Sequence, residues 1–193
     1  MLAPRKIILA SNSPRRKELL QKLGVFFTVL PSDFDESIVK HALPKEVARL
    51  RALGKALDIA MRLQDGIVLG ADTVVALEKK TYGKPKNAAD AKRMLKRLSG
   101  KTHSVFTGIA LVNAKTKERA SAVEESKVKF KKLSAQQIEE YVASGECFGK
   151  AGSYAIQGKA AALIEGYDGS ISNIVGLPLE KLKPMLESFL YCK

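Results

Sequence analysis

Apolar positions along the chain alternate between short continuous runs and helical spacings. Continuous or alternating apolar runs predict strands, which we expect at 7–10, 26–30, 67–77, 104–112 and 123–133. Apolar residues three or four positions apart predict helices at 14–23, 44–63, 87–98 and 134–143, and a last one from about 179. This alternation predicts an α/β fold with a mixed sheet.

Capping residues mark the ends of two predicted helices. Ser13 should cap the helix at 14–23, with Pro14 at its first position and Gly24 after its end. Ser134 and Gln137 have the spacing of a capping box. The longest predicted helix, 44–63, should turn one stripe towards the core, formed by Val47, Leu50, Leu53, Leu57 and Met61.

No internal repeat or linker interrupts this pattern, so we expect a single domain over 1–193. Hydrophobic residues make up 46% and charged residues 27%, which is typical of globular proteins. No apolar stretch reaches the length of a membrane span, and we expect no membrane partner. Cys147 and Cys192 show neither a disulfide framework nor metal-ligand spacing, which favours free thiols in a reducing cytoplasm.

Charge is the unusual bulk property. Lys and Arg total 33 against 20 Asp and Glu, so the net charge is +13 and polyanionic partners are favoured. Only 6% of the residues are aromatic and none is Trp, which leaves few side chains for base stacking and makes nucleic acid the less favoured partner. Charge alone leaves both an enzyme and a nucleic-acid-binding protein open.

The segment 9–16 has the features of an anion site. A buried strand ends, a short loop containing Ser11 follows, and a helix begins at Pro14. Free backbone N–H groups and the helix dipole favour a negative charge there. Arg15 and Arg16 oppose the dipole unless a phosphate lies beside them. The alternative is a well-capped helix with two solvated arginines.

Asp72 is the most informative single residue. It interrupts the apolar strand predicted at 67–77. Burying a carboxylate without a partner is expensive, so a cation or a metal should lie beside it. The alternative, a turn at the end of a strand, is weakened because apolar residues resume at Val74.

Other polar residues are weaker candidates when each is taken alone. The acidic cluster of Asp33, Asp35 and Glu36 suits Mg²⁺, although such a cluster is more often a solvated loop. Three further polar residues sit among apolar, small or rigid neighbours, and each has an ordinary structural or surface explanation as well: Lys55, Lys84 and Gln157.

Taken together, these stretches resemble the Maf family of nucleotide pyrophosphatases. The matching segments follow the family's order along nearly the whole chain, at 9–20, 70–75, 83–85, 98–107, 152–158 and 173–179. The resemblance implies an elongated mixed sheet flanked by helices, with two lobes and a central cleft, similar to inosine triphosphate pyrophosphatase. It also implies hydrolysis of a nucleoside triphosphate to the monophosphate and pyrophosphate.

The resemblance extends to a subgroup. Family members that act on dTTP and UTP carry Arg after Ser-Pro, Thr after the catalytic Asp, and Gln before Gly. The corresponding specificity residues here are Arg15, Thr73 and Gln157. The subgroup that acts on 7-methyl-GTP typically has Trp, Gln and a nearby Glu instead. The segment 169–173 departs from the family's common pattern and carries no argument about specificity.

The resemblance also assigns roles. Asp72 is the expected catalytic base, and Asp72 with Glu36 is expected to bind a divalent cation, Mg²⁺ or Mn²⁺. The expected phosphate-binding residues are Ser11, Arg15, Arg16, Lys55 and Lys84. A purine triphosphate pyrophosphatase and a basic nucleic-acid-binding module are the alternatives. Monomer and homodimer are both compatible with the sequence.

Overall fold

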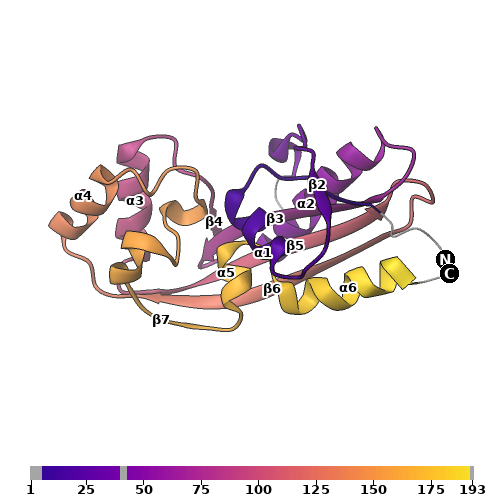
Figure 1. The fold of residues 1–193 in the computed structure, drawn as a ribbon. Helices are drawn as coiled ribbons and strands as arrows, with labels where there is room; N and C mark the ends of the chain where they lie inside the picture. Colours follow the sequence, from indigo (N-terminus) through magenta and orange to yellow (C-terminus); the bar gives the residue numbers. More distant parts are fainter. Residues whose placement is uncertain (1–5, 40–42, 192–193) are drawn as a thin grey trace.

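The computed structural model describes residues 6–39 and 43–191, and within them seven strands form one mixed β-sheet (Figure 1). The order across the sheet is β2-β1-β3-β5-β6-β7, and β4 pairs with β3. The strands are β1 (Ile7–Leu9), β2 (Phe27–Val29), β3 (Ile67–Leu77), β4 (Lys80–Tyr82), β5 (Thr102–Asn113), β6 (Arg119–Phe130) and β7 (Ile164–Asp168).

The sheet has a parallel part and an antiparallel part. β1 pairs in parallel with both β2 and β3. The antiparallel part follows from β3 to β5, from β5 to β6 and from β6 to β7. β3 is buried along nearly its whole length, as its continuous apolar run predicts. The predicted mixed α/β fold is confirmed. The sequence did not reveal β4 and β7, because both are short and largely exposed.

The helices are α1 (Pro14–Gln21), α2 (Pro44–Ala60), α3 (Ala88–Leu98), α4 (Ala135–Ala143), α5 (Ile171–Val175) and α6 (Leu179–Tyr191). Short 3₁₀ helices are η1 (Glu36–Ile38), η2 (Ala151–Ser153) and η3 (Gly158–Leu163). The predicted caps are confirmed, since Ser13 Oγ accepts from the Arg16 N–H and Ser134 forms a full capping box with Gln137. The short α5 was not predicted.

The helices form two groups along an elongated molecule (Figure 1). α2 covers one face of the sheet, where its alanines pack on Val68 and Ala110. On the other face, α1 and α6 pack on residues such as Leu69 and Leu111. α3 and α4 gather around a separate hydrophobic cluster that includes Phe130, at the far end of β6. The two lobes expected from the resemblance are therefore present.

Small residues let α2 approach the sheet closely. The buried face of the helix is a stripe of fully buried alanines one turn apart: Ala48, Ala52, Ala56 and Ala60. They lie over two sheet glycines. A Cβ on Gly108 would stand 2.2 Å from the Ala48 carbonyl oxygen, and a Cβ on Gly70 would stand 2.1 Å from that of Ala52. Glycine is thus required at both positions for this helix-to-sheet distance.

The predicted core stripe of α2 is only partly correct. Val47 is buried, and Leu53 and Leu57 are partly buried at the margin of the core. Leu50 and Met61 are exposed, Met61 to 69%. The apolar pattern of the leucines therefore misplaced the buried face, because the neighbouring glycines select small alanines for closest contact.

No helix in the described part of the chain is both long and apolar enough to cross a membrane. Cys147 is a free, buried thiol, as expected, and burial raises its pKa. Cys192 lies outside the described residues.

We predict that Gly108→Ala destabilises the protein by about 1–3 kcal/mol, because the added methyl group overlaps the backbone of α2. For a chain of this size the midpoint of thermal unfolding should fall by about 2–4 °C per kcal/mol. Gly166→Ala is the matched control, since a Cβ there meets nothing within 4 Å. Equal unfolding midpoints for the two variants would show that the close packing is not a constraint.

Candidate active site

A cleft opens at a gap along one edge of β3. β1 ends at Leu9, opposite Leu69, and β4 begins to pair with β3 only at Val75. Between these points no described strand covers this edge of β3. A cleft of about 560 Å³ lies there, lined by the loop after β1, α1, α2, the loop that leads to η1, and residues 149–157. Both lobes contribute to it, so the expected central cleft is confirmed.

The gap makes both faces of β3 accessible from one cleft. Successive residues of a strand point to opposite faces. Asp72 is directed towards α2, where it meets Lys55, and Thr73 is directed towards α1, where it meets Arg16. The Asp72 carboxylate and the residue that contacts the arginine-rich segment, Thr73, are therefore adjacent on one strand.

Lys55 lies between two carboxylates. Its Nζ donates to Asp72 Oδ1 at 2.6 Å and to Glu36 Oε1 at 2.7 Å. Asp72 is only 5% exposed, and this contact offsets the cost of burying its charge. The expectation that Asp72 has a cationic partner is confirmed. Its partner is Lys55, which the resemblance assigned to phosphate binding.

The loop that carries Glu36 is attached to α2. Asp58 accepts hydrogen bonds from Ser32 Oγ at 2.8 Å and from the Asp33 N–H at 2.9 Å. The Phe34 ring lies so close to Gly54 that a Cβ there would stand 2.3 Å from it. The loop can settle on the helix only because residue 54 has no side chain, and this brings Glu36 to Lys55.

The other two acidic residues of this loop do not join the site. The Asp33 carboxylate is exposed and pairs with Arg62 at 3.3 Å. Asp35 caps η1 by accepting from the Ser37 N–H at 2.8 Å. Of the cluster suggested by the sequence, only Glu36 lines the cleft. The second carboxylate comes from Asp72, far away in the sequence.

The charge of Glu36 is maintained by its surroundings. Burial raises the pKa of Glu36, but the hydrogen bond and charge of Lys55, with the charges of Arg51 and Lys84, outweigh burial. The net effect is a pKa below the usual glutamate value, so Glu36 is ionised at neutral pH.

Asp72 has one oxygen available for further chemistry. Asp72 Oδ2 is buried and has no hydrogen-bond partner among the described residues. Two ionised carboxylates and substrate phosphates are hard oxygen ligands of the kind that Mg²⁺ prefers. In the described part of the chain, no three His, Cys, Asp or Glu side chains are grouped for a metal. The residues present thus fit a cation that shares its ligands with the substrate.

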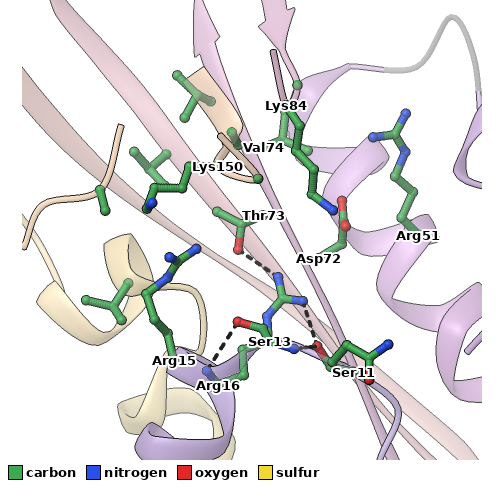
Figure 2. Close-up of a pocket in the computed structure, with 18 of the residues that line it drawn as sticks. Ser11, Ser13, Arg15, Arg16, Arg51, Asp72, Thr73, Val74, Lys84 and Lys150 are labelled. Atoms are coloured by element: carbon green, nitrogen blue, oxygen red, sulfur yellow. Dashed lines mark hydrogen bonds between the residues drawn. The ribbon is translucent and has the colours of Figure 1, made fainter. Parts of the chain in front are cut away.

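Arg16 ties the beginning of α1 to β3 and α5. Its Nε donates to the Gly176 carbonyl oxygen at 2.8 Å. Nη1 donates to Ser11 Oγ at 3.3 Å, and Nη2 donates to Thr73 Oγ1 at 3.1 Å (Figure 2). A guanidinium has five N–H groups. One N–H on each terminal nitrogen therefore remains for a ligand.

The environment of Arg16 favours an anion. Burial lowers the pKa of Arg16, the Asp72 carboxylate opposes this shift, and the charge of Arg15 adds to it. The guanidinium stays protonated because its unperturbed pKa is so high. A partly compensated positive charge thus lies inside the cleft, where a phosphate oxygen would stabilise it.

The Thr73 hydroxyl group is already engaged with the protein. Its Oγ1 lies 3.0 Å from Thr107 Oγ1, and the Thr107 hydroxyl donates to the Asn173 carbonyl oxygen at 2.9 Å. The same Thr73 oxygen accepts from Arg16. Thr73 is placed to hold this guanidinium in position, and its part in base specificity remains a prediction.

The remaining predicted residues all line the cleft, at different depths. Ser11 Oγ accepts from the Ser13 N–H at 3.2 Å and holds the turn before α1. Arg15 is half-buried, and Lys84 is exposed and extends towards Asp72 (Figure 2). Gln157 is also exposed, at the start of η3. It is therefore a residue of the rim.

Two cations of the cleft were missed in the sequence, Arg51 and Lys150. Arg51 precedes Lys55 by four positions, so both lie on one side of α2, a spacing that could have been recognised. Lys150 carries no such signal. Burial lowers the pKa of Lys150, and the charge of Arg15 lowers it further. Among the described residues, six cations and two carboxylates line the cleft, which gives its wall a net charge of +4.

Comparison with known proteins identifies the family of the chain. The family model for Maf-like proteins matches residues 6–189. A dTTP/UTP pyrophosphatase of Gloeobacter violaceus is 48% identical over 186 residues, 95% of this chain and 96% of that protein. A second dTTP/UTP pyrophosphatase, from Ruminiclostridium cellulolyticum, is 47% identical over 184 residues, 95% of each chain.

A solved structure, a HAM1 protein from Coxiella burnetii, has a TM-score of 0.54 at 16% identity, covering 95% of this chain and 99% of that one. At this identity the likeness concerns the fold alone. The family model and the relatives extend over nearly the whole sequence, and the residues matched by the family model include every residue of the cleft described above. The chain therefore belongs to the family of Maf-like proteins.

Proposed function

We propose that this chain is a nucleoside triphosphate pyrophosphatase that hydrolyses dTTP and UTP to the monophosphate and pyrophosphate. Relatives of this name are 47–48% identical over nearly their whole length. The observation that carries the proposal is Asp72, a buried carboxylate with a free Oδ2 inside a cleft whose wall is strongly positive. Such a wall attracts and concentrates a polyphosphate.

The proton-transfer role belongs to Asp72. Lys55 holds the carboxylate through Oδ1, and Oδ2 accepts the proton of the water that attacks the α-phosphorus. Arg16 offers its two remaining N–H groups to phosphate oxygens, and Arg15 adds positive charge on the side of the α-phosphate. Lys84 neutralises charge that develops on the leaving pyrophosphate. The N-terminus of α1, with Ser11 beside it, holds a further phosphate.

A divalent cation, Mg²⁺ or Mn²⁺, would be held by Asp72 and Glu36. When bound, it supplies Lewis-acid polarisation of a phosphoryl oxygen. Asp72 has enough acceptor positions both to hold a cation and to accept a proton. Each carboxylate oxygen has two such positions, and Asp72 Oδ1 uses one of them for Lys55.

The base would be recognised at the opposite end of the cleft from Glu36. The Gln157 amide has one donor and one acceptor face, which match the carbonyl and N–H edge shared by uracil and thymine. Arg15 lies on the same side of the cleft as Lys150 (Figure 2), and Thr73 acts through Arg16. Because Gln157 lies on the rim, water competes for its hydrogen bonds and weakens the discrimination.

A cytoplasmic location is part of the proposal. It is supported by the free thiol of buried Cys147, which suits a reducing compartment.

We predict that Asp72→Asn lowers kcat/KM for UTP by about 10²–10⁴-fold, the usual contribution of a general base. Lys55 keeps Glu36 as a partner, so the variant should still fold, which circular dichroism can verify. Asp65→Asn is the matched control, because Asp65 is exposed and does not line the cleft. Retention of more than about a tenth of the wild-type rate, a barrier change below ~1.4 kcal/mol, would refute the role of Asp72.

A second prediction concerns the metal. Excess chelator should abolish the release of pyrophosphate from UTP, and added Mg²⁺ or Mn²⁺ should restore it, because two ionised carboxylates otherwise face a triphosphate of the same sign. The assay measures pyrophosphate against orthophosphate over a titration of each cation. Full hydrolysis in the presence of chelator would contradict the two-carboxylate metal site.

A third prediction concerns the base. UTP and dTTP should be preferred over CTP, ATP, GTP and 7-methyl-GTP, and the ratio of kcat/KM for UTP over CTP should be about tenfold. The expected ratio is no larger because Gln157 is exposed, so water can satisfy the groups that a mismatched base leaves unpaired. Gln157→Ala should reduce the ratio, whereas Gln136→Ala, on the exposed face of α4, should not. A preference for 7-methyl-GTP would assign the chain to the other subgroup.

A further inference from the structure

Arg51 is a cation of the cleft that the proposed mechanism does not use. It lies on α2 one turn before Lys55 and lines the cleft with it. Figure 2 shows its side chain rising from the helix on the side of Asp72 where Lys84 also lies. Arg15 and Lys150 occupy the other side of Thr73 in the same view.

The guanidinium of Arg51 is poorly satisfied by the protein. Its Nε is buried and has no hydrogen-bond partner among the described residues. Its Nη1 reaches Glu36 Oε2 at 3.5 Å, the outer limit of a hydrogen bond. The side chain is only 24% exposed, so water cannot freely supply the missing acceptors. Such unpaired donors are costly, which indicates that an acceptor is expected from outside the chain.

The neighbouring arginines of α2 and of the cleft differ in this respect. Arg49 donates through two nitrogens to Glu46 and through the third to Ser121. Arg16 uses all three nitrogens on protein acceptors. Glu36 does not satisfy the hydrogen-bond donors of Arg51 in the same way. Its single carboxylate is shared between Arg51, at 3.5 Å, and Lys55, at 2.7 Å.

We propose that Arg51 binds the two terminal phosphates of the substrate and the pyrophosphate that they become. This inference rests on the function proposed above. With Asp72 next to the α-phosphorus and the base on the side of Arg15, the remaining phosphates extend towards Glu36. The charges of Arg51, Lys55 and Lys84 all act on Glu36, which places these three cations around that end of the cleft.

The chemistry of the side chain suits this position. When water attacks the α-phosphorus, the bond to the bridging oxygen breaks and its electron pair leaves with pyrophosphate. A guanidinium fork can donate two parallel hydrogen bonds to such phosphate oxygens and stabilise the charge that develops there. A lysine offers a point charge without this geometry, so Arg51→Lys should retain only part of the affinity for phosphate.

The test uses inorganic pyrophosphate and UMP, the two products, as separate probes. Calorimetric titration of the folded protein, without turnover, gives the dissociation constant of each. Arg51→Met should weaken pyrophosphate binding by about ten- to hundredfold, the loss expected for hydrogen bonds to a charged group, and Arg51→Lys should weaken it less. UMP binding should change by less than about twofold. Arg49→Met is the matched control on the same helix and should leave both values unchanged.

A double-mutant cycle distinguishes direct phosphate binding by Arg51 from an indirect role in which Arg51 only positions Glu36. If Arg51 contacts phosphate directly, Arg51→Met weakens pyrophosphate binding in a Glu36→Gln background as well. Loss of the effect in that background overturns the proposal, as does pyrophosphate binding by Arg51→Met equal to that of Arg49→Met. An equal weakening of UMP and pyrophosphate binding also overturns it. Hydrolysis of UTP by the wild-type protein tests the proposed function separately, because calorimetry requires no turnover.

Discussion

The separation between α2 and the sheet decides whether Lys55 can reach the buried carboxylate of Asp72. Alanines at 48, 52, 56 and 60 lie against Gly70 and Gly108, where a Cβ would overlap the helix backbone. This distance is what allows the Lys55 ammonium group to reach 2.6 Å from Asp72. A helix held further away would leave a buried carboxylate without its cation, at a cost of several kcal/mol. The same helix also holds the loop of Glu36, through Asp58 and the space at Gly54.

A second constraint is the gap between the end of β1 and the beginning of β4. Because no described strand covers the edge of β3 opposite β5 between Gly70 and Val74, consecutive residues that point to opposite faces both serve one cleft. Asp72 meets Lys55 of α2, and Thr73 holds Arg16 at the start of α1. A parallel strand, β1, ends early on this edge of β3, and the gap it leaves brings Asp72 and the turn before α1 into one cleft. In the proposed function these are the proton acceptor and a phosphate-binding turn. Binding at the carboxyl end of such a strand is common in open α/β sheets.

The parts of this arrangement that depend on local sequence could be predicted. A carboxylate in an apolar run identified Asp72, and capping chemistry identified the beginning of α1 at Ser13. The buried face of α2 could not be predicted from its own pattern. Leu50 and Met61 satisfy the helical spacing yet are exposed, because the glycines that select the alanine face are on strands distant in sequence. Arg51 lies one turn before Lys55, so its place in the cleft could have been recognised from the assignment of Lys55 to the site.

Electrostatics then connects the fold to its ligand. Arg16 is half-buried with its pKa lowered by desolvation, and the buried Nε–H of Arg51 has no acceptor among the described residues. A wall of net charge +4 also repels itself in the absence of an anion. Each of these features lowers the stability of the free protein, and in the proposed function phosphate oxygens would relieve it. A ligand that binds only the folded state stabilises it in proportion to the logarithm of its concentration. Binding of a polyphosphate would therefore release the free energy stored in the unpaired cations, which would favour the ligand with the most phosphate oxygens.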